Sequence, residues 1–97
     1  MAKYDVHVFG EGFLLDVQDD YLSALNTRIV VPLLPKADAA FVSEKLNPVF
    51  LVNGEEMVME THLLAAVPAS SLGRPVGSLV ERFDEITRAL DFAFHGF

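Results

Sequence analysis

The chain has 97 residues, enough for a single domain over residues 1–97, with 52% hydrophobic residues and a formal net charge of −7. Its 7 basic side chains do not cluster as phosphate binding requires, which argues against direct nucleic-acid binding. Cysteine is absent, the first residues lack the apolar core of a signal peptide, and no apolar run approaches the roughly 20 residues of a membrane span, so we expect a cytoplasmic protein with no membrane contact.

The share of hydrophobic residues is larger than a monomer of this length easily buries. An apolar interface between two copies is the simplest way to cover the remainder. The composition therefore predicts a homodimer.

The N-terminal third predicts three strands. Residues 3–9 and 13–18 alternate as strands do, and the Gly10-Glu11-Gly12 segment between them favours a hairpin. Residues 27–33 are rich in β-branched side chains and predict a central strand. Its Pro32 is expected near an end or on an edge, because proline cannot donate to a strand ladder.

A second hairpin is predicted around Asn53-Gly54, a dipeptide typical of two-residue turns, with strands over residues 48–52 and 55–61. Prolines bound residues 35–48, which we expect to form a loop with one helical turn at most. Residues 68–77 hold two prolines and two glycines and predict an irregular connector.

One helix is predicted at the end of the sequence, starting at a capping box formed by Ser78 and Glu81. Apolar residues recur from there at helical spacing and are expected to pack on the sheet: Leu79, Phe83, Ile86, Leu90, and Ala93 or Phe94. Several short strands followed by one helix predict a mainly β (α+β) protein, an antiparallel barrel, partly open, with a C-terminal α-helix.

The opposite face of this helix carries Arg88, Asp91 and His95, with Phe92 beside them. The sequence continues into Gly96 and Phe97. Two interpretations of Phe92 stay open: it packs under a neighbouring loop or at a dimer seam, or it belongs to a partner site in which aromatic and arginine side chains dominate binding.

No motif for catalysis or metal binding emerges. We expect Asp16, Asp19 and Asp20 to form a solvated turn rather than a magnesium or calcium site. Strand alternation separates Glu55 from Glu56.

The three histidines have no zinc-like spacing; His7, between two valines, is expected to point to solvent, and His62 to follow a strand end. No phosphate-binding glycine pattern is present. We therefore expect no enzyme activity, no metal and no cofactor.

Five segments in order resemble the CcdB toxin family: LLDVQDD, TRIVVPL, NPVFLVNGEE, AAVPASSLG and the terminal helix with its glycine near the end. The resemblance covers nearly the whole chain at similar spacing. It implies an SH3-like barrel, a homodimer, and a toxin of a bacterial toxin–antitoxin module. Such toxins bind the DNA gyrase A subunit and trap the enzyme on cleaved DNA, and a cognate antitoxin neutralises them with a C-terminal segment that folds on binding.

The resemblance also assigns residues. The family ends in Trp-Gly-Ile, its gyrase-poisoning tip, which falls on His95, Gly96 and Phe97 here. A family asparagine on the same helix face falls on Asp91. The gyrase-binding set is thus expected to be His95, Gly96, Phe97, Asp91, Phe92 and Arg88. An apolar family pair falls on Tyr21-Leu22, a possible further partner contact.

Three alternatives remain open at this stage. His95 replaces the tryptophan of the family, so the toxin is either a gyrase poison or a dimer that is weakened, inactive or retargeted. An RNA-cleaving toxin of related barrel fold would need basic residues near a general acid and base, which the acidic composition disfavours. A structural dimer module without toxicity is the third alternative.

Overall fold

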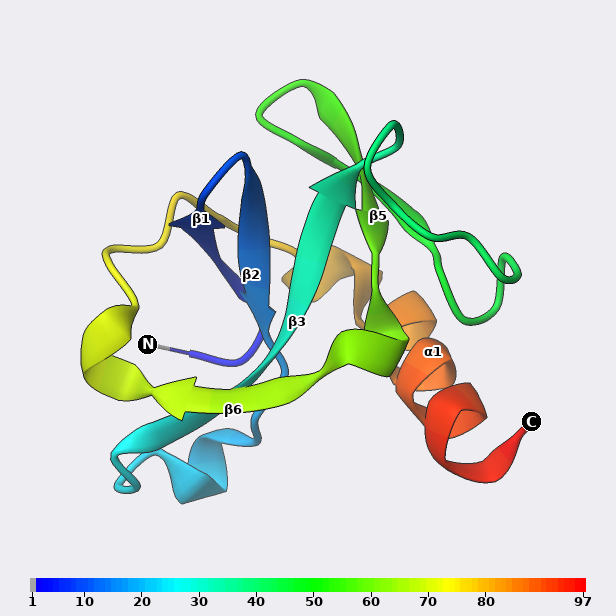
Figure 1. The fold of residues 1–97 in the computed structure, drawn as a ribbon. Coiled ribbons are helices and arrows are strands. Elements are labelled where there is room, and N and C mark those ends of the chain that lie inside the picture. The colour runs from blue at the N-terminus through cyan, green and yellow to red at the C-terminus, as the bar shows by residue number, and fades with distance from the viewer. Residues whose placement is uncertain (1) are drawn as a thin grey trace.

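The computed structural model describes residues 2–97 as a nearly closed antiparallel β-barrel with one helix, α1, at the C-terminal end (Figure 1). The strands follow the order β4-β5-β3-β2-β1-β7, and β6 also pairs with β3. Their bounds are β1 Asp5–Phe9, β2 Gly12–Asp16, β3 Thr27–Pro35, β4 Val49–Val52, β5 Glu55–Met59, β6 Ala65–Pro68 and β7 Gly77–Ser78. The predicted fold class is confirmed.

Both predicted hairpins are present. β1 and β2 pair around the Gly10-Glu11 turn, and β4 and β5 pair from Val52 opposite Glu55 outward. Asn53 and Gly54 both have positive φ, 51° and 83°, which is the requirement of the tight turn that joins twisted strands. Asparagine and glycine are the residues that adopt this backbone at least cost, so the dipeptide fixes the register here.

Pro32 lies inside the nine-residue strand β3 and not near an end; of the two predicted locations, an end or an edge, the structure shows a local edge. On one side of β3, β6 pairs with Thr27–Val30 and β5 pairs with Leu33–Pro35, so the partner changes beside Pro32. The Pro32 carbonyl points to this gap and accepts a 2.9 Å bond from the Glu60 N–H. Since the N–H and C=O of one strand residue point the same way, the missing donor costs no ladder bond.

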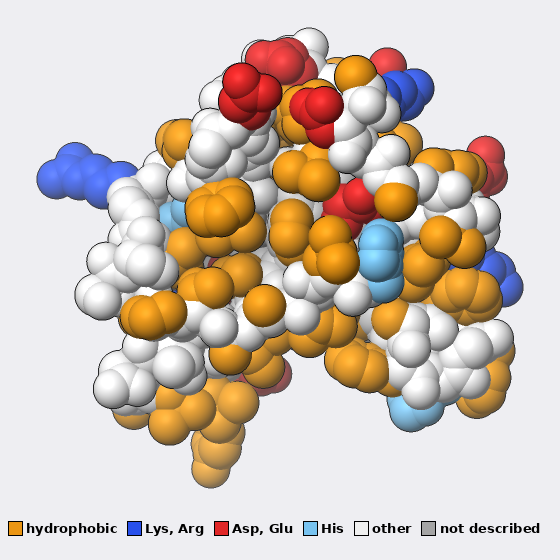
Figure 2. Space-filling view, in the orientation of Figure 1, with side chains coloured by type: hydrophobic (Ala, Val, Ile, Leu, Met, Phe, Trp, Pro, Cys, Tyr) orange, Lys and Arg blue, Asp and Glu red, His pale blue; other side chains and the backbone are white. Residues whose placement is uncertain are grey.

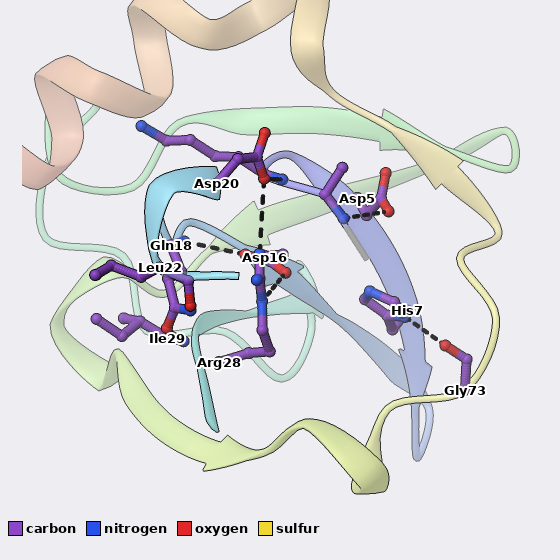
Figure 3. A network of polar contacts seen from close by, with 11 residues as sticks. Asp5, His7, Asp16, Gln18, Asp20, Leu22, Arg28, Ile29 and Gly73 are labelled. Carbon is purple, nitrogen blue, oxygen red and sulfur yellow. Dashed lines mark hydrogen bonds and ion pairs between the residues drawn. The ribbon is translucent and has the colours of Figure 1, made fainter. Parts of the chain in front are cut away.

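Both faces of the N-terminal hairpin are covered. One face contributes Val6 and Leu15 to the core, together with Val31 and Leu33 of β3. The other face carries His7, which is fully buried and not solvent-exposed as predicted, because the 69–76 connector crosses it. His7 Nδ1 lies 2.8 Å from the Gly73 carbonyl (Figure 3).

The connectors are short and irregular. Single 3₁₀ turns are found at η1 Asp20–Leu22, η2 Thr61–Leu63, η3 Ala69–Ser71 and η4 Val80–Arg82. The 36–48 loop has turns but no helix, as predicted. It is held by Asn47, which is buried and bonds both the Met59 carbonyl and the Val42 N–H.

The helix begins later than predicted. α1 runs over Phe83–His95, and the predicted capping box does not form: Ser78 belongs to β7 and its hydroxyl accepts from the Val80 N–H at 3.2 Å. The intervening 3₁₀ turn η4 advances about 120° per residue instead of about 100°, which shifts the phase of every later position relative to Leu79. Ile86 and Leu90 of the predicted apolar stripe pack on the core together with Ala89. Phe83, Ala93 and Phe94 of that stripe are exposed, contrary to the prediction.

Candidate interaction surface at the C-terminal helix

One side of α1 is anchored in the barrel. Ile86 and Ala89 are fully buried and Leu90 is half-buried against the core. Burying a side chain such as Ile86 contributes about 1.5–3 kcal/mol. The helix is thus positioned firmly while its remaining sides face outward.

Gly96 ends the helix in a left-handed conformation. Its φ is 78°, and its N–H donates a 2.8 Å bond to the Phe92 carbonyl. A residue with a Cβ is strained at this φ, which explains the glycine. The cap turns the chain away from the helix axis, so Phe97 does not continue the helical stripe.

The last residues, Phe94, His95, Gly96 and Phe97, form an exposed aromatic cluster that we call the C-terminal tip. Phe97 is 82% exposed and Phe94 63% exposed. The His95 ring lies 5.9 Å from the Phe97 ring at an angle of 32°, and 6.5 Å from the Phe94 ring at 66°. The sequence predicted that either Ala93 or Phe94 packs on the core, but both are exposed, so Phe94 was missed as a tip residue.

The predicted polar face extends back from the tip. Arg88 and Asp91 are exposed, and Arg88 Nε donates to the Asp84 carbonyl at 3.3 Å. Phe92 is half-buried, and the ammonium of Lys45 lies 6.0 Å from its ring centre. Lys45 belongs to the 36–48 loop, so Phe92 contacts a neighbouring loop, one of the two interpretations, and keeps part of its surface open.

Tyr21 and Leu22 lie elsewhere. They belong to η1, where the Asp19 carboxylate accepts from the Tyr21 N–H, and Tyr21 is 91% exposed. Figure 1 shows η1 and the end of α1 well apart on the barrel. Within one chain the structure therefore does not bring this pair together with the C-terminal tip.

The start of α1 carries one ion pair. Arg82 donates from Nε and Nη2 to the two carboxylate oxygens of Glu85, at 2.6 and 2.9 Å. This hydrogen bonding lowers the pKa of Glu85 and raises that of Arg82. Arg82 also lies over the Phe50 ring, 4.9 Å from its centre, and so ties the helix start to the barrel.

Of the three acidic residues predicted to form a solvated turn, Asp19 and Asp20 do so at η1, but Asp16 does not. Asp16 is fully buried and pairs with Arg28 (Figure 3), and Glu60, also buried, accepts from the Ala40 N–H at 2.6 Å. Asp19 and Asp20 are exposed. Over residues 2–97 no three His, Asp or Glu side chains are arranged to hold a metal ion.

Comparison with known proteins decides the family. Residues 4–96 match the family described as CcdB protein. The chain belongs to the CcdB family. It is therefore a CcdB-family toxin of a toxin–antitoxin system.

The fold is shared more widely than the family. The Mycobacterium tuberculosis toxin MazF-mt6 superposes with a TM-score of 0.75 over 93% of this chain and 95% of its own, at 16% sequence identity. At that identity the likeness concerns the barrel and helix alone. In the part of the CcdB-family toxin described here, no helix has the length and apolarity to span a membrane.

Proposed function

We propose that this toxin binds the A subunit of DNA gyrase in the bacterial cytoplasm and traps the enzyme on cleaved DNA. A cognate antitoxin neutralises it through a C-terminal segment that folds on binding. The observation that carries the proposal is the C-terminal tip, an exposed aromatic cluster at the positions of the gyrase-poisoning residues of the family. The tip projects from a helix whose other side is buried, so it is presented rigidly.

The binding face consists of the tip and the adjoining polar side of α1. Phe97 and Gly96 provide an apolar side chain and a close backbone approach, while Arg88, Asp91 and Phe92 extend the contact along the helix. Tyr21 and Leu22 are a further contact.

Gyrase binding tests the proposal directly. Burial of the Phe97 ring in a partner supplies about 2–3 kcal/mol, so Phe97→Ala should weaken binding to the gyrase A subunit about 30- to 150-fold. The matched control is Phe83→Ala, because Phe83 is an exposed aromatic side chain on the same helix, outside the binding face. Equal loss in both variants, or no gyrase binding by the parent protein, would contradict the proposal.

His95 offers a gain-of-function test. The family has tryptophan at this position, and an indole buries more apolar surface than an imidazole. His95→Trp should strengthen gyrase binding and inhibition of supercoiling. If the variant gains nothing while the antitoxin still binds the parent toxin, the target has changed.

We also propose that the toxin is a homodimer. The outer edge of β6 is unpaired within residues 2–97, and Ala65, Ala66 and Leu63 beside it are exposed. Figure 2 shows apolar side chains spread over this side of the molecule. Sedimentation at micromolar concentration should give a molecular mass of about twice 10.7 kDa. A monomer at all micromolar concentrations would contradict the proposed homodimer.

We propose that this toxin cleaves neither RNA nor DNA. The buried acids and the buried histidine are engaged inside the protein: Asp16 with Arg28, Glu60 with the 36–48 loop, and His7 with Gly73. We infer that the toxin acts by binding and without a cofactor. RNA and DNA should stay intact on incubation with purified protein, with or without magnesium.

A further inference from the structure

The outer edge of β4 is an open strand edge. β4 ends the sheet, and β5 pairs with it on one side only. Val52 and Glu55 flank the two-residue turn, and the Met59 N–H donates to the Pro48 carbonyl at 2.9 Å. Both are hydrogen-bonded pairs. Because hydrogen-bonded and non-hydrogen-bonded pairs alternate along an antiparallel ladder, the N–H and C=O groups of Val49 and Leu51 point away from β5. No hydrogen bond from elsewhere in residues 2–97 reaches them.

A groove of about 710 Å³ lies beside this edge. Its lining includes Val49 and Val58 of the β4–β5 hairpin, Ala39 and Phe41 of the 36–48 loop, and Glu85 of α1. Phe41 and Leu51 are 58% and 65% exposed. In Figure 1 the loop projects on the same side of the barrel as α1.

One charge in the groove has no partner. Lys36 pairs with Glu56 at 3.5 Å, and Glu85 pairs with Arg82. Glu44 lines both this groove and a smaller hollow that continues toward Arg88, and it makes no ion pair within the described residues. Lys45 and Arg88 also line this hollow, but Lys45 lies over the Phe92 ring and neither forms an ion pair with Glu44. The Glu44 carboxylate is therefore left for a basic side chain of a partner, next to the apolar lining.

We propose that the β4 edge binds an extended peptide segment of a partner polypeptide by strand addition. The segment pairs its backbone with Val49 and Leu51, places an apolar side chain in the groove, and sets a lysine or arginine beside Glu44. The outward N–H and C=O groups of Val49 and Leu51 are two residues apart. The backbone groups on one side of an extended chain repeat with the same two-residue period, so they can pair with them.

The site is separate from the C-terminal tip, and its test does not depend on gyrase. The probe is an acetylated, amidated hexapeptide of alternating valine and lysine, titrated to millimolar concentration into ¹⁵N-labelled full-length protein. Binding should slow hydrogen exchange of the Val49 and Leu51 amides about tenfold and leave Phe50 and Val52, already bonded to β5, unchanged. A valine–glutamate peptide should bind more weakly, and Glu44→Gln should reduce that difference.

Two controls separate strand addition from apolar contact. In one N-methylated peptide the valine nitrogens are methylated, and in the other the lysine nitrogens; strand addition requires that one of them loses binding and the other keeps it. Leu51→Pro removes only an outward N–H and should abolish binding, whereas Leu51→Val should retain it. No protection of Val49 and Leu51, equal binding of both methylated peptides, or protection of these amides by self-association of the free protein would overturn the proposal.

Discussion

The guanidinium Nε of Arg28 donates a 2.7 Å hydrogen bond to Asp16 Oδ2 inside the barrel, where both side chains are excluded from solvent. The bond raises the pKa of Arg28. The other carboxylate oxygen of Asp16 accepts from the Gln18 N–H at 3.0 Å, and the Gln18 side chain bonds the Leu22 carbonyl and the Ile29 N–H. This network joins the end of β2 to the start of β3 and supports the η1 turn (Figure 3).

Asp16→Ala should destabilise the protein by roughly 3–5 kcal/mol, because it leaves the buried Arg28 charge without its partner. Urea denaturation measures the free energy of unfolding. The double variant Asp16→Leu with Arg28→Met should lose less than the single variant, since no buried charge remains. Asp20→Ala is the control: Asp20 is exposed and lies 4.0 Å from Arg28, so it should cost about 1 kcal/mol or less. If Asp16→Ala and Asp20→Ala lose the same free energy of unfolding, burial does not determine how much the Arg28–Asp16 ion pair contributes to stability.

The fold and the tip could be predicted because their signals are local. Asn53-Gly54 specifies its own turn, and strand alternation needs only neighbouring residues. The errors concern long-range structure. The sequence predicts that His7 faces solvent, because strand alternation assumes that one face of the hairpin is exposed to water. No residue near His7 in the sequence indicates that the 69–76 connector covers that face. Asp16 looked solvated because its partner Arg28 lies on the next strand.

The helix shows a different limit. Its existence and the inward-facing Ile86 and Leu90 could be predicted from the sequence. The burial of the whole apolar stripe could not, because Phe83 and Phe94 lie near the two ends of α1, where the barrel does not cover them. The proposal that His95, Gly96 and Phe97 face a partner rests on the family resemblance together with the outward helix face. Phe94 could have been added from the density of phenylalanine at the end of the sequence.

Asn47→Ala should loosen the 36–48 loop. The Asn47 side chain is fully buried; it accepts from the Val42 N–H at 2.8 Å and donates to the Met59 carbonyl at 3.0 Å. Removing it leaves these groups unpaired, which should cost roughly 1–3 kcal/mol and speed exchange of the Val42 amide. Ser43→Ala is the control, because Ser43 is partly exposed and bonds only the Leu46 N–H through its hydroxyl. Unchanged Val42 exchange in Asn47→Ala would refute this role.

The Glu85–Arg82 pair should make a small part of the stability depend on pH. Its hydrogen bond holds the pKa of Glu85 below the ordinary value of 4.5. The contribution is therefore fully present above about pH 4.5 and is lost as the pH falls through the lower pKa of the folded state. Both side chains are about 40% exposed, so salt should weaken the effect. Thermal melting between pH 3 and 7 should show that the melting temperature of Glu85→Gln falls less in acid than that of the parent protein. The control is Glu81→Gln, at an exposed residue without an ion pair in the described chain, and its melting temperature should fall as much as that of the parent protein.

Gly96 can separate backbone strain from partner contact. At φ 78° an L-alanine should cost about 1–2 kcal/mol, so Gly96→Ala should lower the melting temperature and fray the last turn of α1. For Gly96→Ala nothing within the protein lies within 4 Å of the added Cβ, so the cost is that of the backbone conformation alone. D-alanine at this position, introduced by chemical synthesis, suits the positive φ and should therefore restore stability. If the partner approaches the Gly96 backbone closely, the D-alanine protein will be as stable as the parent and still bind gyrase less tightly. Full recovery of binding with D-alanine would instead show that Gly96 serves only to end the helix and aim Phe97.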